Sequence, residues 1–141
     1  MDYICQAISQ LYNLHNLTIN LSYNRSISND TLLYLSKAVG QLPRLRKLSL
    51  NMGQTETSNY GFDNLFLALK RCERIKILKI WFSPKANDST YLSLSKLLID
   101  LKYLRSLKIN GNKIEVTGLN ALHQGLMKTR LNNLNVEFYD P

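Results

Sequence analysis

Residues 45–52 have the sequence LRKLSLNM, with leucine at 45, 48 and 50 and methionine at 52. From position 48 every second residue is apolar, and this period of two is typical of a strand with one buried face. The same spacing occurs five times along the chain. The central leucines of the five copies are Leu17, Leu48, Leu78, Leu107 and Leu134. The sequence therefore predicts five strands, each of about five to seven residues.

The segments between the strands have the apolar spacing of helices. The central leucines are 31, 30, 29 and 27 residues apart, a period that fits a unit of one strand and one helix. Leu35, Ala38, Val39 and Leu42 would share one face of the first such helix. Short polar residues that can accept the free amide hydrogens of a first turn predict N-caps. They stand at 29–31, 59, 87–89 and 117.

These in-register copies resemble the leucine-rich-repeat family, in particular its ribonuclease-inhibitor-like subclass, in which each repeat contains a helix. The resemblance covers essentially the whole chain. It implies an α/β fold, a curved right-handed solenoid of βα units with about five parallel strands on the concave face and helices on the convex face. It also implies a role in gripping other macromolecules.

One part of the family motif is nearly missing. The family places an asparagine three residues after the last apolar residue of the motif, where it ties adjacent turns together. Only Asn112 meets this requirement, and the matching positions elsewhere are Ser22, Gly53, Ser83 and Tyr139. We therefore expect irregular turns from strand to helix, with a protruding loop at 53–61.

Residues 1–141 are expected to form a single domain of about four to five repeats that starts and ends within a repeat. Residues 1–13 match the helical half of a repeat, and residues 131–138 predict a strand with no helix after it. Two explanations remain open, a piece of a longer array or ends that dock against partners. Cys5 and Cys72 are expected to be core thiols rather than a disulfide, since a chain of this length can bury a sizeable core unaided.

Several classes of function lack a motif in this sequence. The six glycines form no nucleotide-binding loop. His15 and His123 have no Cys or carboxylate at a metal-ligand spacing, and no nucleophile has a recognisable base. We therefore expect no enzyme, no cofactor, no metal and no small-molecule substrate. With neither a signal peptide nor an apolar run of membrane-spanning length, an intracellular, by default cytoplasmic, protein without a membrane partner is expected.

The strand residues that alternate with the core leucines should line the concave face in columns. One column would contain Lys79 and Lys108, and the next would place Trp81 between Asn51 and Asn110. Because large aromatic side chains often anchor interfaces, these five residues are the predicted site for a protein partner. The alternative is that Trp81 simply packs against its neighbours.

A basic stripe is predicted along the edge where helices lead into strands. Its members recur at two repeat positions, and they are Arg44, Arg46, Arg74, Lys76, Arg105 and Arg130. Cations near helix carboxyl ends complement the helix dipole, so the stripe has a structural explanation. It would also suit an anionic ligand, such as an RNA backbone or an acidic protein surface, in a chain with a formal net charge of +8.

Two functional hypotheses follow. The first is a non-enzymatic scaffold subunit that binds protein partners through the concave sheet and the solenoid ends, as part of a larger assembly. The alternative is a subunit associated with RNA or DNA through the basic stripe.

Overall fold

Strands and helices alternate along the whole of the computed structural model, which describes residues 1–140. The strands are β1 (Asn16–Asn20), β2 (Lys47–Asn51), β3 (Ile77–Trp81), β4 (Ser106–Asn112) and β5 (Asn133–Tyr139). The helices are α1 (Asp2–Ser9), α2 (Asn29–Val39), α3 (Asn59–Leu69), α4 (Asp88–Asp100) and α5 (Val116–Leu126). The strands form one parallel sheet in the order β1-β2-β3-β4-β5, so the protein is an α/β protein built of repeating βα units.

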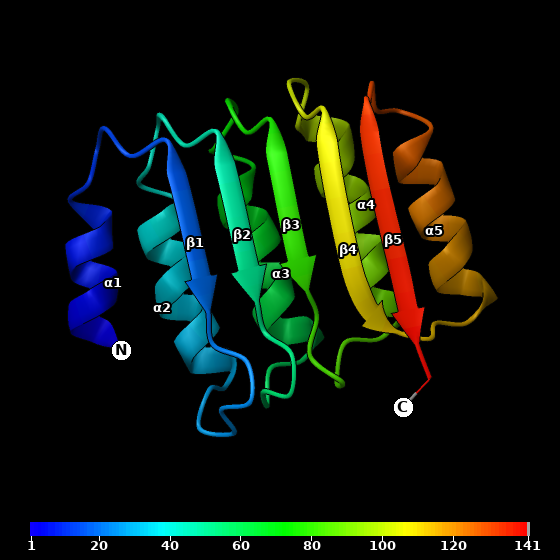
Figure 1. Cartoon of the computed structure of the whole chain (residues 1–141), viewed down its shortest axis with the longest axis horizontal. Coiled ribbons are helices and arrows are strands. Elements are labelled where there is room, and N and C mark those ends of the chain that lie inside the picture. Colours follow the sequence, from blue (N-terminus) through cyan, green and yellow to red (C-terminus); the bar gives the residue numbers. More distant parts are fainter. Residues whose placement is uncertain (141) are drawn as a thin grey trace.

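The molecule has two layers. In Figure 1 the sheet lies in front and the helices lie side by side behind it, so that one face of the sheet is covered and the other, here called the open face, is not. Each strand pairs with the next in a constant register, for example Leu48 with Leu78 and Leu78 with Leu107. This register confirms the columns that the sequence predicts.

The core lies between the sheet and the helices. The apolar strand residues turn toward the helices, and in the three inner strands they are at most 1% exposed at the positions of Leu48, Leu78 and Leu107. Leu35 of α2 and Leu65 of α3 cover them and are themselves buried. Burying a leucine stabilises a fold by about 1.5–3 kcal/mol, so this repeated layer is the main source of stability.

The helices begin slightly earlier than the sequence predicted. Ser28 and Ser58 are the N-caps of α2 and α3, and Glu115 is that of α5; only Asn87 lies at an N-cap as expected. Asn29 is free to act elsewhere because Ser28 takes the cap position. Its side-chain oxygen accepts a hydrogen bond from the Ser58 N–H at 2.8 Å.

A similar bond joins the last two helices. The Asp88 carboxylate accepts hydrogen bonds from the N–H groups of Glu115 (3.0 Å) and Gly118 (2.8 Å), at the start of α5. Asn112 donates to the Pro84 carbonyl at 3.1 Å, which is the one link of the kind expected for the family asparagine. Three polar side chains at different positions thus connect neighbouring units.

The expectation of a protruding loop after β2 is wrong. Thr55 is 3% exposed and Thr57 is fully buried. The Thr55 hydroxyl donates to the Met52 carbonyl at 2.8 Å, and the Glu56 N–H donates to the Ile27 carbonyl of the previous unit at 2.9 Å. The Ser83 hydroxyl of the next unit donates to the Thr57 carbonyl. The segment is therefore held between its two neighbours.

Two sequence predictions concern the whole chain. Cys5 and Cys72 are both buried and unpaired, as expected of core thiols, and burial raises the pKa of Cys72 to about 11. Across residues 1–140, no helix is both long enough and apolar enough to cross a membrane.

Candidate functional site

The open face presents lysines and one tryptophan at its centre. Lys79 of β3 pairs in register with Lys108 of β4, and both are partly exposed. Two ion pairs occur in residues 1–140, Lys70 with Asp100 and Lys85 with Glu56, so neither central lysine has a carboxylate partner. Two neighbouring ammonium groups of the open face are therefore not neutralised by an ion pair within residues 1–140.

Trp81 stands beside these lysines and is partly exposed. It pairs in register with Asn51 on one side and Asn110 on the other, as predicted. The Lys108 ammonium lies over its ring, 5.4 Å from the ring centre, in a cation–π contact. A contact of this kind contributes about 0.5–1 kcal/mol at an exposed site.

Asn110 does not have the exposed position that the partner-binding prediction requires. It is only 5% exposed. Its side-chain NH2 donates to the Glu137 carboxylate at 2.8 Å and to the Tyr139 hydroxyl at 3.0 Å, while its oxygen is buried without a hydrogen-bond partner in residues 1–140. Asn110 therefore connects β4 to the side chains of β5 and has little exposed surface for a partner.

Glu137 is the acidic residue of this face, and its carboxylate accepts hydrogen bonds from Asn110 and Tyr139. The Tyr139 hydroxyl donates to it at 2.5 Å, and this bond holds the pKa of Glu137 below its ordinary value. The same bond raises the pKa of Tyr139. One carboxylate oxygen of Glu137 is thus engaged, whereas Lys79 and Lys108 form no ion pair in residues 1–140.

A shallow hollow of about 340 Å³ lies where the strands end, next to Trp81. All five units contribute to its lining, among them Tyr23, Asn51, Gln54, Trp81 and Tyr139. The Asn51 oxygen accepts the Gly53 N–H at 3.0 Å, so its NH2 group is the part left for a ligand. The hollow therefore combines an indole edge, phenol rings and amide donors.

Two residues of this hollow have unusual backbone geometry. Tyr23 and Gln54 occupy equivalent places three residues after β1 and β2, with φ of 60° and 58°. Each follows a turn that an asparagine side chain closes, since Asn20 accepts the Ser22 N–H as Asn51 accepts that of Gly53. The left-handed conformation is uncommon for residues other than glycine, and Tyr23 is 84% exposed.

Aromatic rings form a rigid layer beneath the hollow. Phe82 packs edge-on against Phe62 (ring centres 4.8 Å apart) and against Tyr91 (5.2 Å). The Tyr91 hydroxyl is buried without a partner among the described residues, and burial raises its pKa. Gly111 lies directly above it, because a Cβ at this position would approach the Tyr91 oxygen to 2.3 Å.

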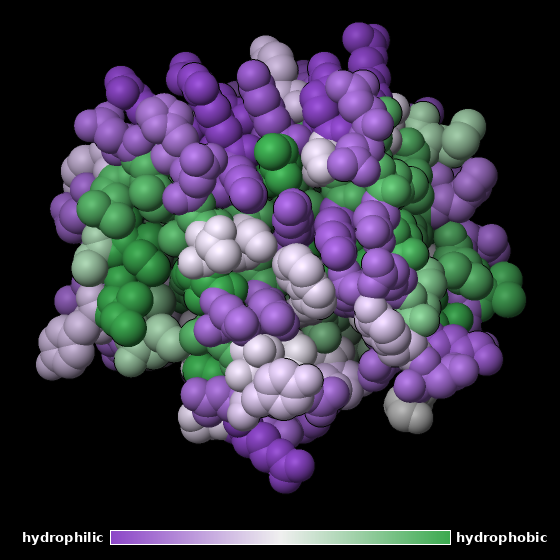
Figure 2. Space-filling view, viewed as in Figure 1, coloured by the Kyte–Doolittle hydropathy of each residue, from purple (hydrophilic) through white to green (hydrophobic). Residues whose placement is uncertain are grey.

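Four residues of the basic stripe, Arg46, Arg74, Lys76 and Arg105, form a row at the amino ends of β2, β3 and β4. The main chain links its members directly, since Lys76 N–H donates to the Arg46 carbonyl (2.8 Å) and Arg105 N–H to the Lys76 carbonyl (2.9 Å). Arg46, Arg74, Lys76 and Tyr103 line one shallow hollow together. Figure 2 shows hydrophilic side chains along the top of the view, over these strand ends.

Not every cation of the stripe is equally free. Arg44 donates to the Asn13 side chain at 2.8 Å, and Arg105 donates to the carbonyls of Lys102 (3.1 Å) and Leu104 (2.9 Å). These contacts of Arg105 engage its guanidinium with carbonyls of the segment between α4 and β4. Arg130 lies apart, in a hollow with Lys102 and Lys128.

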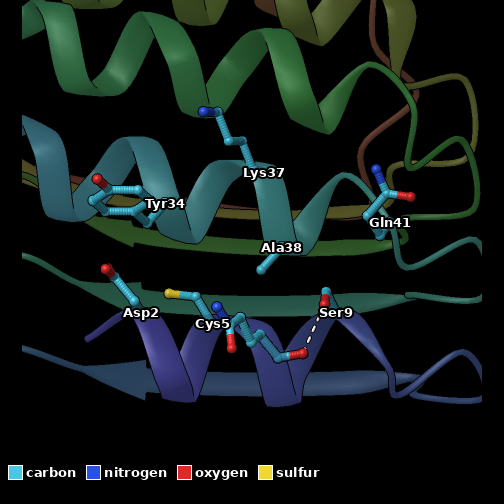
Figure 3. Close-up of a pocket in the computed structure, with 8 residues that line it drawn as sticks. Asp2, Cys5, Ser9, Tyr34, Lys37, Ala38 and Gln41 are labelled. Atoms are coloured by element: carbon cyan, nitrogen blue, oxygen red, sulfur yellow. Dashed lines mark hydrogen bonds between the residues drawn. The ribbon is translucent and has the colours of Figure 1, made fainter.

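A groove of about 340 Å³ runs between α1 and α2 on the helical side. Figure 3 shows Cys5 and Ala38 facing each other across it, while Lys37 points away toward the next helix. The Ser9 hydroxyl donates to the Gln6 carbonyl of its own helix at 2.7 Å. The exposed surface that lines this groove is mainly apolar.

The sequence missed three members of the open-face site, Tyr23, Gln54 and Tyr139. Tyr139 could have been found, because it lies two residues after Glu137 and so shares its face. The positive φ of Tyr23 and Gln54 has no sequence signal, since neither is glycine or asparagine.

Comparison with known proteins gave no match, either to a protein-family model or to a curated protein sequence.

Proposed function

We propose that the chain is a leucine-rich-repeat solenoid and that it acts as a non-enzymatic protein-interaction module, a scaffold subunit whose open face is the concave binding surface. The constant register of the five parallel strands, with a helix between each strand and the next, supports the architecture. The observation that carries the function is Trp81, which contacts the Lys108 ammonium and lines a hollow on the open face of the sheet. A partly exposed tryptophan is a common anchor for a protein partner.

The chemistry of the face indicates the kind of protein segment it binds. Lys79 and Lys108 lack carboxylate partners, and Glu137 is engaged by Tyr139. A segment rich in carboxylates and carbonyl groups would supply the missing acceptors, and its apolar or aromatic side chains could pack on the indole. The proposed partner is therefore an acidic, extended protein segment.

Trp81 is the only tryptophan of the chain, so its fluorescence reports directly on this face. We propose to titrate the protein with a peptide that alternates glutamate with tyrosine or leucine, and with a matched peptide that carries lysine in place of glutamate. The acidic peptide should change the emission and the basic one should not. Lys79→Glu with Lys108→Glu should abolish the response, and Lys96→Glu, on the exposed surface of α4, should preserve it.

Equal responses to the two peptides, or binding that the double lysine variant leaves intact, would exclude this face as an acidic-segment site. Circular dichroism of each variant separates lost binding from lost fold. Crosslinking of the full chain in cell extract, scored at Lys79 and Lys108, would then identify the natural partner.

A second candidate function, association with RNA or DNA, rests on the basic row. Arg46, Arg74 and Lys76 are exposed, line one hollow and form no ion pair in residues 1–140. Changing all three to glutamate should abolish retention of a single-stranded oligonucleotide at low salt. If each contacts one phosphate, a milder change to glutamine should flatten the log–log salt dependence by about 2. Retention that survives the glutamate variant would reject this function.

A further inference from the structure

The first unit keeps core residues that the structure leaves uncovered. Ile4 and Leu11 of the first unit occupy the positions of Leu35 and Leu42 in the second. The latter pair is 2% and 1% exposed, whereas Ile4 is 61% and Leu11 49% exposed. The difference is one of neighbours, because no strand or helix of residues 1–140 lies beyond β1 and α1 on that side.

The last unit has the same property on the opposite side. Leu134 of β5 is 48% exposed, although its equivalents in the inner strands are buried. Leu119 of α5 is also 45% exposed, whereas Tyr91, the equivalent residue of α4, is 1% exposed. Figure 2 shows hydrophobic surface at the left side of the molecule, next to α1, and at the right side, next to α5.

These two end faces are the two halves of one repeated junction. At every inner junction two successive N–H groups of one unit donate to a single carbonyl of the unit before it, as Arg46 and Lys47 do to His15, and Asn132 and Asn133 to Arg105. Continuing this pattern by one step would bring the His15 and Asn16 N–H groups of a second molecule to the Asn132 carbonyl. One end therefore offers the donors that the other end can accept.

We propose that this protein associates with copies of itself head to tail, with the β5 edge of one copy pairing in parallel with the β1 edge of the next and α5 packing against α1. The observed register fixes the contacts. Leu134 would lie beside Leu17 of the second copy, and Val136 beside its Ile19, in the arrangement that Leu107 and Ile109 show with Leu134 and Val136 inside one chain. A second copy is the occupant because each molecule carries both matching halves.

The symmetry of this contact predicts the form of the assembly. Different surfaces meet at each junction, so two copies do not close on themselves, and each added copy leaves one free end of each kind. Sedimentation of the full chain over a range of concentrations should give a series of dimers, trimers and longer species. A single closed dimer would contradict the proposal.

Variants blocked at one end give the decisive test. Leu17→Lys blocks the β1 edge and leaves β5 intact, and Leu134→Lys does the reverse. Each alone should stay monomeric, whereas an equimolar mixture should form one heterodimer and nothing larger. Leu67→Lys and Ile99→Lys, at exposed positions of α3 and α4, are the matched controls and should assemble like the unaltered protein.

A crosslink tests the register itself. Thr18→Cys in one preparation and Asn135→Cys in another should be joined by a short bis-maleimide when mixed, and neither should crosslink alone. The native thiols do not interfere, because both are buried and burial raises their pKa. A protein that is monomeric at every concentration, or oligomers that persist in both blocked variants, would overturn the proposal.

Discussion

Leu78 and Leu134 occupy the same position in equivalent strands, but their surroundings differ. Leu78, in the central strand, is fully buried, whereas Leu134, in β5, is 48% exposed. The strand period determines that both side chains turn toward the helical layer. A neighbouring unit on each side determines whether that layer closes over them. The comparison shows that the position of a leucine in the array, and not the local motif, determines how far it is buried and so how much it contributes to stability.

The largest expected effect comes from an inner leucine. Leu78→Ala should lower the free energy of unfolding by about 2–5 kcal/mol, because it leaves a cavity that neighbours on both sides hold open. Urea denaturation followed by circular dichroism measures the loss. A cost no greater than that of Leu134→Ala would remove the distinction between inner and outer units.

The next effect concerns the glycine above the aromatic layer. Gly111→Ala should cost about 1–3 kcal/mol, because the new methyl group meets the Tyr91 hydroxyl in a packed interior. Tyr91→Phe removes that hydroxyl and should restore part of the loss in the double variant. If the two changes are simply additive in denaturation experiments, the proposed clash is absent.

Asp88 connects an inner unit to the outer one. Asp88→Ala should cost about 1–2 kcal/mol, since two N–H groups at the start of α5 lose their acceptor. Relative to the unaltered protein, amide hydrogen exchange in the variant should become faster in α5 and stay unchanged in α3. Asp30→Ala, at an exposed position in the first turn of α2, is the control and should change neither quantity appreciably.

Leu134, the leucine of the outer strand, should show a much smaller loss of stability than Leu78. In the monomer, Leu134→Ala should cost less than about 1 kcal/mol, because about half of the side chain already contacts solvent. The measurement should be made in the Leu17→Lys background at low concentration, so that no junction contributes. A loss as large as that at Leu78 would mean that β5 is as tightly packed as the inner strands.

The smallest effect is a pH dependence at the outer strand. A lowered pKa of Glu137 adds stability that is present above the unfolded-state pKa, about 4.3 for glutamate, and is lost as the pH falls through the lower folded-state value. Tyr139→Phe removes the main cause, so it should reduce the difference in denaturation midpoint between neutral and acidic pH slightly. Tyr60→Phe, at a position 70% exposed, should leave the difference unchanged.

The strands were predictable because period and register lie in the sequence itself. Five copies of one spacing fix which residues turn inward, and a parallel array then aligns Lys79 with Lys108 and Trp81 with Asn51. The basic row followed from the same alignment. The loops could not be read in this way, because composition does not reveal hydrogen bonds between units.

Thr55, Thr57 and Asn110 illustrate this limit. The polar segment after β2 resembles an exposed loop, but bonds from the units on both sides bury Thr55 and Thr57. Asn110 occupies its predicted column, yet Glu137 and Tyr139 of the next strand engage its amide. In each case a partner about 25–30 residues away decides the outcome, at the distance of one repeat.

The constant register has an evolutionary consequence. Each strand lies only beside its sequence neighbours, and residues 47–76 form one complete unit between equivalent positions. Removing that segment would place Ile77 where Lys47 stood, beside Asn16, with the alternation of inward and outward residues intact. The number of strands is therefore a variable that whole-segment deletion or duplication can change without redesigning the fold, while the residues brought beside Trp81 change with every such event.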